Sequence, residues 1–121
     1  MKSHINELTQ KKCQPCNKGT VPFTRAQAAD CLRELAEWNL SSDAKSIWRE
    51  YLMKDFLSAV RFINQIAQVA EAEDHHPDLH LTGYRKLRIE LATHAIGGLC
   101  ENDFILAAKI DTLPKELKKP A

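Results

Sequence analysis

The chain has 121 residues, 44% of them hydrophobic, and this length and composition predict one folded domain rather than a disordered protein. Its 17 basic and 16 acidic residues give a formal net charge of +1 without a basic stripe, so we expect no nucleic-acid partner. The N-terminus lacks the apolar core of a signal peptide, and no apolar run is long enough to span a membrane. We therefore expect a cytoplasmic protein with no membrane partner, whose four cysteines a reducing compartment keeps as thiols.

Residues 1–23 are expected to form an irregular N-terminal arm, because Gly19 and Pro22 are poor helix formers. Cys13 and Cys16 form a single CxxC motif within it. A redox role would place such a pair at the start of a helix in a thioredoxin-like context, and a zinc site would need four ligands, shared across subunits. An ordinary structural role of the two cysteines is the interpretation that the sequence favours.

The folded domain is expected to begin with a helix over residues 25–37, because Thr24 is a good N-cap residue and Gln27 follows as in a capping box. Residues 38–43 can hold a short strand and a turn. Residues 46–52 are rich in bulky strand formers and predict a second strand that pairs with the first.

The clearest helix is predicted over residues 54–73. It should end near Glu73, because His76 precedes a proline and is therefore disfavoured in the helical conformation. We expect this helix to lie on a sheet through one apolar face, with Ile66 beside it. The residues of that face are Phe56, Val60, Ile63, Ala67 and Ala70.

A short strand is predicted over residues 79–81, followed by a turn at Gly83 and an alternating strand from Tyr84. The inward set is Leu87, Ile89, Leu91 and Thr93, and the outward set is Lys86, Arg88, Glu90, Ala92 and His94. A last helix is predicted over residues 103–110, and residues 114–121 are expected to form a frayed tail.

The order α-β-β-α-β-β-α predicts an α+β fold, with a single layer of about four antiparallel strands and helices on one face. The domain is expected to span residues 24–113, between the arm and the tail. An open sheet leaves edge strands that can pair between subunits, so we expect a homo-oligomer.

Three of the five histidines lie in two short segments. The segments are Asp74-His75-His76-Pro77 and Ala92-Thr93-His94. Because histidine exchanges protons near neutral pH and also binds metals, the cluster suggests either proton transfer or a metal site. Adjacent histidines diverge in an extended chain and are poor joint ligands for one ion, so we predict no metal ligand. A polar connection between a helix and a strand is the ordinary alternative.

Two carboxylates accompany the histidines. Asp74 is either a solvated group at the end of a helix or a hydrogen-bond partner that orients an imidazole. Asp103 lies in the first turn of the last helix, where the helix dipole favours an acid. With Cys100 at the cap position, Asp103 resembles half of a capping box, and it is also a candidate to tune a histidine.

These motifs lie within a longer resemblance that covers roughly residues 24–111. The matching segments are Glu73-Asp74-His75-His76-Pro77, Tyr84, Ala92-Thr93-His94 and Gly98-Leu99-Cys100-Glu101-Asn102-Asp103-Phe104-Ile105-Leu106-Ala107. Together with the order of elements, they make the chain resemble the pterin-4a-carbinolamine dehydratases. The resemblance implies dehydration of 4a-hydroxytetrahydrobiopterin to quinonoid dihydrobiopterin, in tetrahydrobiopterin recycling, after an aromatic amino acid hydroxylase has used the pterin. It also implies a homodimer or homotetramer that needs no metal and no other cofactor.

The resemblance also implies the roles of particular residues. The catalytic residues carry over to His75, His76 and His94. Substrate binding carries over to Asp74, His75, His76, Ala92, Thr93 and His94. Loss of the 4a-hydroxyl needs a proton delivered to the leaving oxygen and a proton removed from N5. We expect His75 and His94 to supply this acid and base, with His76 holding the pterin and Asp103 as a supporting residue.

Some positions depart from the family pattern. Leu79 stands where many members have an aromatic residue, and the segment 79–83 is one residue longer than in the animal form. Cys100 stands where Ser or Thr is common. The resemblance is therefore to the plant-type and bacterial branch, and the role of the animal protein as a partner of a transcription factor is not carried over. An alternative function is a pterin-binding or protein-interaction module with weak catalysis, linked to molybdenum cofactor metabolism.

Overall fold

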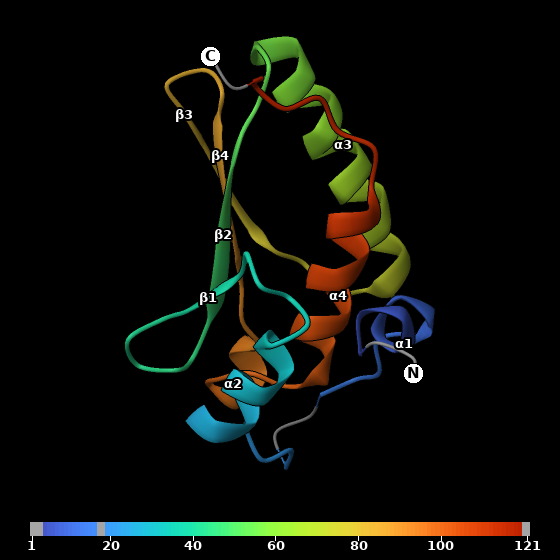
Figure 1. Ribbon diagram of the computed structural model, residues 1–121. Helices are drawn as coiled ribbons and strands as arrows, with labels where there is room; N and C mark the ends of the chain where they lie inside the picture. The colour runs from blue at the N-terminus through green and yellow to red at the C-terminus, as the bar shows by residue number, and fades with distance from the viewer. Residues whose placement is uncertain (1–3, 17–18, 120–121) are drawn as a thin grey trace.

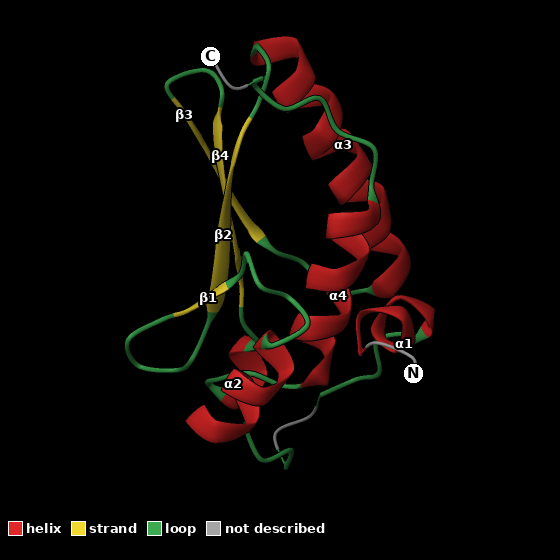
Figure 2. Cartoon of the chain, in the orientation of Figure 1, coloured by secondary structure: helices red, strands yellow, loops and turns green. Residues whose placement is uncertain are grey.

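Four antiparallel strands form one open sheet in the computed structural model, which describes residues 4–16 and 19–119. The strands are β1 (Asn39–Leu40), β2 (Ile47–Leu52), β3 (Asp78–Thr82) and β4 (Lys86–Leu91). Their order across the sheet is β1-β2-β4-β3. The long helices α3 (Phe56–Glu73) and α4 (Glu101–Thr112) lie on one side of the sheet (Figure 1; Figure 2). The predicted α+β architecture is therefore confirmed.

The alternation predicted for β4 is also confirmed. Leu87, Ile89 and Leu91 are fully buried, whereas Arg88 and Glu90 are only partly covered. β4 pairs with β2 on one side and with β3 on the other, so it is a central strand, and its buried side chains share the core with Ile47 and Tyr51 of β2. This placement fixes the end of β4, where the predicted site residues begin.

Helix α3 begins and ends close to its predicted limits. The Asp55 carboxylate accepts a hydrogen bond from the backbone N–H of Ser58 at 2.8 Å and caps the helix. The predicted apolar face was wrong in part, because Phe56 is 52% exposed and Ala67 is exposed as well. The buried residues are Ser58, Ala59, Phe62, Ile66 and Ala70. The first half of this helix is apolar over a broad arc, so periodicity alone did not select the face that packs.

The other helices differ from prediction at their ends. Helix α2 (Arg25–Leu32) has the predicted capping box at Thr24 but stops before residue 37. The chain then forms turns, and Leu35 and Trp38 enter the core without helical geometry. Helix α4 is two residues longer at each end than predicted.

The N-terminal arm is not irregular throughout, which corrects the prediction. It contains helix α1 (His4–Gln10), which packs against α4. Leu8 and Cys13 are buried in the common core, and Lys11 forms an ion pair with Glu101 at 2.9 Å. The turn-forming residues restrict only the later part of the arm, and a helix this short depends on tertiary packing that local sequence does not reveal.

The tail is likewise not frayed over its described part, residues 114–119. The backbone N–H of Lys118 donates to the carbonyl of Leu52, and that of Lys54 donates to the carbonyl of Glu116, each at 2.9 Å. These bonds extend the pairing beyond the end of β2. The tail is therefore ordered by a partner more than 60 residues earlier in the chain, for which its own sequence carries no signal.

Candidate active site

A pocket of about 650 Å³ lies where the end of α3, the end of β4 and the N-terminal arm meet. Its volume is that of a small-molecule site. All of the predicted substrate-binding residues line it: Asp74, His75, His76, Ala92, Thr93 and His94. The structure therefore brings together two segments that the sequence keeps 16 or more residues apart. A smaller hollow of about 360 Å³ shares Ala92–His94 but has neither His75 nor His76, so we assign the site to the larger pocket.

The end of α3 aims the first histidine inward. Asp74 adopts a left-handed conformation, with φ of 52° and ψ of 42°, and caps the helix. The backbone N–H of the next residue, His75, donates to the carbonyl of Ala70 at 3.1 Å. This turn leaves the Asp74 side chain exposed and covers His75, whose side chain is only 11% exposed. The helix ends where predicted, but the left-handed aspartate was not foreseen, since glycine is the usual residue there.

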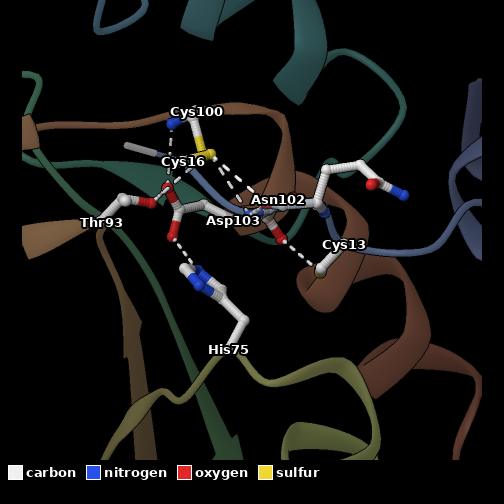
Figure 3. Close-up of a disulfide and its surroundings, with 8 residues drawn as sticks. Cys13, Cys16, His75, Thr93, Cys100, Asn102 and Asp103 are labelled. Carbon is white, nitrogen blue, oxygen red and sulfur yellow. Dashed lines mark hydrogen bonds and ion pairs between the residues drawn. A yellow bond between two sulfur atoms is a disulfide. The ribbon is translucent and has the colours of Figure 1, made fainter. Parts of the chain in front are cut away.

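His75 is hydrogen-bonded to a fully buried carboxylate. Its Nε2 lies 2.7 Å from Oδ1 of Asp103 (Figure 3). The other oxygen of Asp103 accepts hydrogen bonds from the Thr93 hydroxyl at 2.8 Å and the Cys100 backbone N–H at 3.0 Å. Because a carboxylate only accepts, Nε2 of His75 must carry the proton, and Nδ1 is left for a ligand. Asp103 thus combines the two interpretations, since it stabilises the first turn of α4 and holds an imidazole.

His94 and His76 are both more exposed than His75. His94 starts a 3₁₀ turn (His94–Ile96) just after β4, and its side chain is on the exposed side, as the alternation predicted. Thr93 is buried and points toward Asp103. The side chain of His76 is 54% exposed and forms a hydrogen bond with the Glu71 carboxylate. The three histidines therefore differ in exposure: His75 is largely covered and held by Asp103, whereas His76 and His94 are exposed at the rim of the pocket.

The N-terminal arm forms a further wall of the pocket, which sequence reasoning missed. Lys12, Gln14 and Cys16 are among its lining residues. The backbone N–H of Gln14 donates to Asn102 Oδ1 at 2.9 Å, and Asn102 Nδ2 donates back to the Gln14 carbonyl. The sequence separation is 88 residues, so no local sequence pattern indicated this contact.

Glu73, the last residue of α3, ties the arm to both long helices. Its carboxylate accepts hydrogen bonds from the backbone N–H of Cys13 at 2.7 Å and from Lys109 Nζ at 3.0 Å. Burial alone would raise the pKa of Glu73, but these two donors outweigh it and hold the pKa below its ordinary value. The pocket wall is therefore anchored by an ionised group beside the histidine motif.

The cysteines were expected to remain thiols, and the structure corrects this for two of them. Cys16 and Cys100 form a disulfide across 84 residues (Figure 3). Cys13 is a buried thiol whose sulfur lies 3.7 Å from the carbonyl oxygen of Asn102. Burial, and then the nearby Glu73 carboxylate, raise the pKa of Cys13 to about 12. The CxxC motif is thus divided between a disulfide and an unreactive thiol.

Metal binding and membrane crossing each have a recognisable structural pattern. Among residues 4–16 and 19–119, no three His, Cys, Asp or Glu side chains are arranged to hold a metal ion. Of the described helices, none has the length and apolar character that crossing a membrane requires.

Comparisons with known proteins identify the family of this chain. A family model described as pterin 4 alpha carbinolamine dehydratase matches residues 21–113. A relative from Halorhodospira halophila named for this dehydratase is 49% identical over 106 residues, covering 88% of this chain and 96% of its own. "Pterin-4-alpha-carbinolamine dehydratase 2, mitochondrial" of Arabidopsis thaliana is 47% identical over 115 residues, covering 93% of this chain and 62% of the plant protein.

A solved structure shares the fold. A Brucella melitensis protein described as a transcriptional coactivator/pterin dehydratase superposes with a TM-score of 0.70 at 33% identity, covering 74% of this chain and 95% of that chain. The match of the family model over most of the chain, together with these relatives, shows that the protein belongs to the pterin-4-alpha-carbinolamine dehydratase family.

Proposed function

We propose that this protein removes water from a pterin 4a-carbinolamine, converting 4a-hydroxytetrahydrobiopterin to quinonoid dihydrobiopterin in tetrahydrobiopterin recycling. The observation that carries the proposal is the hydrogen bond between His75 and the buried Asp103 in a pocket that His76 and His94 also line. Membership of the family supports the same activity. An aromatic amino acid hydroxylase, which forms the carbinolamine, would be the partner that precedes it.

The reaction needs two proton transfers. The C4a–O bond breaks as a proton reaches the leaving oxygen, and the N5–H proton is removed so that the nitrogen lone pair forms the new double bond to C4a. We assign these transfers to His75 and His94, one as acid and the other as base. Asp103 holds Nε2 of His75 and stabilises the imidazolium form, so that Nδ1 exchanges the proton. No metal is needed for either transfer.

The remaining pocket residues are assigned to binding. The carboxylate of Asp74 is exposed at the rim of the pocket and accepts hydrogen bonds only, which suits the N3–H and 2-amino donors of a pterin ring. His76 lies beside it and would contact the ring, while Ala92 and Thr93 form the floor next to His94. The substrate would then lie across the ends of α3 and β4.

The activity is tested by stopped-flow measurement of carbinolamine dehydration with the wild-type protein. We expect the rate to exceed the spontaneous rate in proportion to protein concentration. The alternative is a pterin-binding or protein-interaction module with weak catalysis, linked to molybdenum cofactor metabolism. Its protein-interaction part is supported by the description of the Brucella relative as a transcriptional coactivator/pterin dehydratase. Pterin binding measured by calorimetry, without any acceleration of dehydration, would support that alternative instead.

We also propose that the protein is a homodimer or homotetramer located in the cytoplasm. The outer strands β1 and β3 have free edges within the described sheet, and several large apolar residues near the end of β2 and in the turn between β3 and β4 are exposed. These residues are Leu52, Phe56, Leu57, Tyr84 and Leu117. Sedimentation equilibrium tests the assembly, and a monomer at micromolar concentration would contradict it. Microscopy of a tagged full chain tests the location, which the plant relative's mitochondrial name leaves open.

A further inference from the structure

The Cys16–Cys100 disulfide connects the wall of the pocket to the carboxylate that holds His75. Cys16 lines the pocket, and Cys100 is the N-cap residue of α4. The backbone N–H of Cys100 donates to Asp103, which is in turn bonded to His75 (Figure 3). One covalent bond therefore joins the end of the arm to the element that positions a predicted catalytic histidine.

We propose that this disulfide is a thiol–disulfide exchange site, at which low-molecular-weight thiols of the glutathione class free the Cys16 segment of the arm from its covalent anchor beside the pterin pocket. The exchange itself follows from the positions of the sulfur atoms, and only its effect on turnover rests on the proposed dehydratase function. In the oxidised protein the disulfide fixes the arm as a wall of the pocket. In the reduced protein only noncovalent contacts hold the residues next to Cys16 against the pocket.

The burial of the two sulfurs decides where exchange begins. Cys100 is 3% exposed, whereas Cys16 is only partly covered and faces the pocket. An incoming thiolate therefore attacks the sulfur of Cys16. The bond between the two cysteines breaks, and Cys100 leaves with the electron pair and takes a proton from solvent. A second thiolate then attacks the small-molecule sulfur of this mixed disulfide, and Cys16 leaves with the electron pair and takes up a proton. Two small thiols thus become one small-molecule disulfide, and both cysteines become thiols.

The site of Cys100 favours its role as the leaving group. A thiolate at a helix N-terminus is stabilised by the free backbone N–H groups and the helix dipole. The Thr93 hydroxyl oxygen lies 3.3 Å from the Cys100 sulfur and donates its own hydrogen to Asp103. Once protonated, the Cys100 thiol can donate to that oxygen, so the reduced form keeps a polar partner in the buried site.

Cys13 does not resolve the disulfide from within the chain. It is buried, and its raised pKa keeps it protonated at neutral pH, so it supplies almost no attacking thiolate. Its backbone N–H is also fixed to Glu73. The CxxC motif therefore needs an external thiol, which sets it apart from a dithiol redox motif.

Reduction should affect binding more than chemistry. The bonds from Gln14 to Asn102 and from Cys13 to Glu73 remain, so the arm stays attached, but the segment ending at Cys16 loses its covalent anchor. The bond between His75 and Asp103 does not depend on the disulfide. We expect the KM for the pterin to rise roughly three- to tenfold, the factor that follows from reordering one or two side chains on binding, while kcat stays nearly constant.

The test treats the full chain with glutathione buffers of increasing ratio of thiol to disulfide. Alkylation and peptide mass spectrometry report the Cys16–Cys100 bond, and hydrogen exchange reports the arm around Gln14. We expect the disulfide to be lost, and backbone hydrogen exchange around Gln14 to become faster, over the same range of glutathione ratios. Cys16→Ser should show the arm exchange of reduced wild type at every glutathione ratio. Cys13→Ser and the control Cys31→Ser should respond to the glutathione ratio as wild type does. Cys31 lies on α2 and does not line the pocket.

The outcomes separate this inference from the proposed activity. Bond mapping and arm exchange need no turnover, so they remain readable if no dehydratase activity is found. Absence of the Cys16–Cys100 peptide after oxidation would overturn the exchange site. An intact bond that opens without changing arm exchange or KM would overturn its control of the pocket. Loss of the buffer response in Cys13→Ser would overturn the need for an external thiol.

Discussion

At the scale of single residues, the site depends on how one carboxylate divides its hydrogen bonds. Asp103 is fully buried and accepts from His75, Thr93 and the Cys100 backbone. A buried carboxylate without such partners would be strongly unfavourable, so the three donors are what allow it to lie beside the pocket. The same contacts fix the tautomer of His75. We therefore propose that Asp103, whose sequence position also fits an ordinary acid at a helix terminus, positions His75 for the proposed catalysis.

The first prediction concerns this residue. Asp103→Asn should lower kcat by roughly 10²-fold or more with little change in KM, because an amide can no longer stabilise the imidazolium of His75. Nitrogen NMR of His75 should show loss of the fixed Nε2–H tautomer. Asp43→Asn, in the exposed loop between β1 and β2, serves as the control and should leave both measurements unchanged. A stable Asp103→Asn protein with wild-type kcat would contradict the positioning role.

At the scale of elements, the ends of α3 and α4 hold the site and the arm together. Glu73 closes α3, binds the arm through Cys13 and reaches Lys109 on α4. Its pKa is held below the ordinary value of 4.5 in the folded chain. A group with a lowered pKa contributes stability above its unfolded pKa, and the contribution is lost as the pH falls through the folded pKa.

Glu73→Gln should therefore be less stable than wild type at pH 7 by about 2 kcal/mol, the size expected for hydrogen bonds to a charged group. The difference should shrink as the pH falls below 4.5 and through the lowered folded-state pKa, where the wild-type carboxylate takes up its proton. Urea unfolding at the two pH values measures this, with the exposed Glu50→Gln on β2 as the control. A stability difference between Glu73→Gln and wild type that is the same at both pH values would show that the ionised carboxylate of Glu73 does not stabilise the fold.

Sequence reasoning succeeded where the pattern is local. The capping box of Thr24, the alternation through β4 and the burial of Thr93 against exposed His94 all follow from neighbouring residues. It failed where the determinant lies far along the chain: helix α1, the docked tail and the disulfide each depend on partners at least 60 residues away. The misassigned face of α3 has another cause, since apolar residues cover two adjacent stripes there.

At the scale of the whole molecule, the arm is part of the folded unit. Leu8 and Cys13 belong to the core. Hydrogen bonds from Asn102 to Gln14 and from Glu73 to the Cys13 backbone hold the arm at the pocket. The domain that holds the candidate site therefore includes residues before the family match begins at residue 21. The Cys16–Cys100 disulfide links two positions 84 residues apart and so closes a loop that contains most of this folded unit.

Breaking that bond should lower global stability. A disulfide with a sequence separation of 84 restricts the unfolded chain strongly, and its loss should cost about 3 kcal/mol and lower the Tm by roughly 10 °C. Calorimetry of oxidised and reduced wild type measures the shift, and Cys16→Ser should unfold like the reduced protein. The control Cys31→Ser should show the same decrease in Tm on reduction as wild type. Equal Tm values for oxidised and reduced wild type would contradict this role of the bond.

The central claim is that His75 and His94 carry the proton transfers of a dehydratase. The most direct measurement is stopped-flow dehydration of the 4a-carbinolamine by wild type, His75→Ala, His94→Ala and His80→Ala. His80 is exposed on β3 outside the pocket and is the matched control. We predict that each of the first two variants loses roughly 10²–10⁴-fold in kcat, while His80→Ala keeps wild-type activity. Full activity in either His75→Ala or His94→Ala would contradict the account.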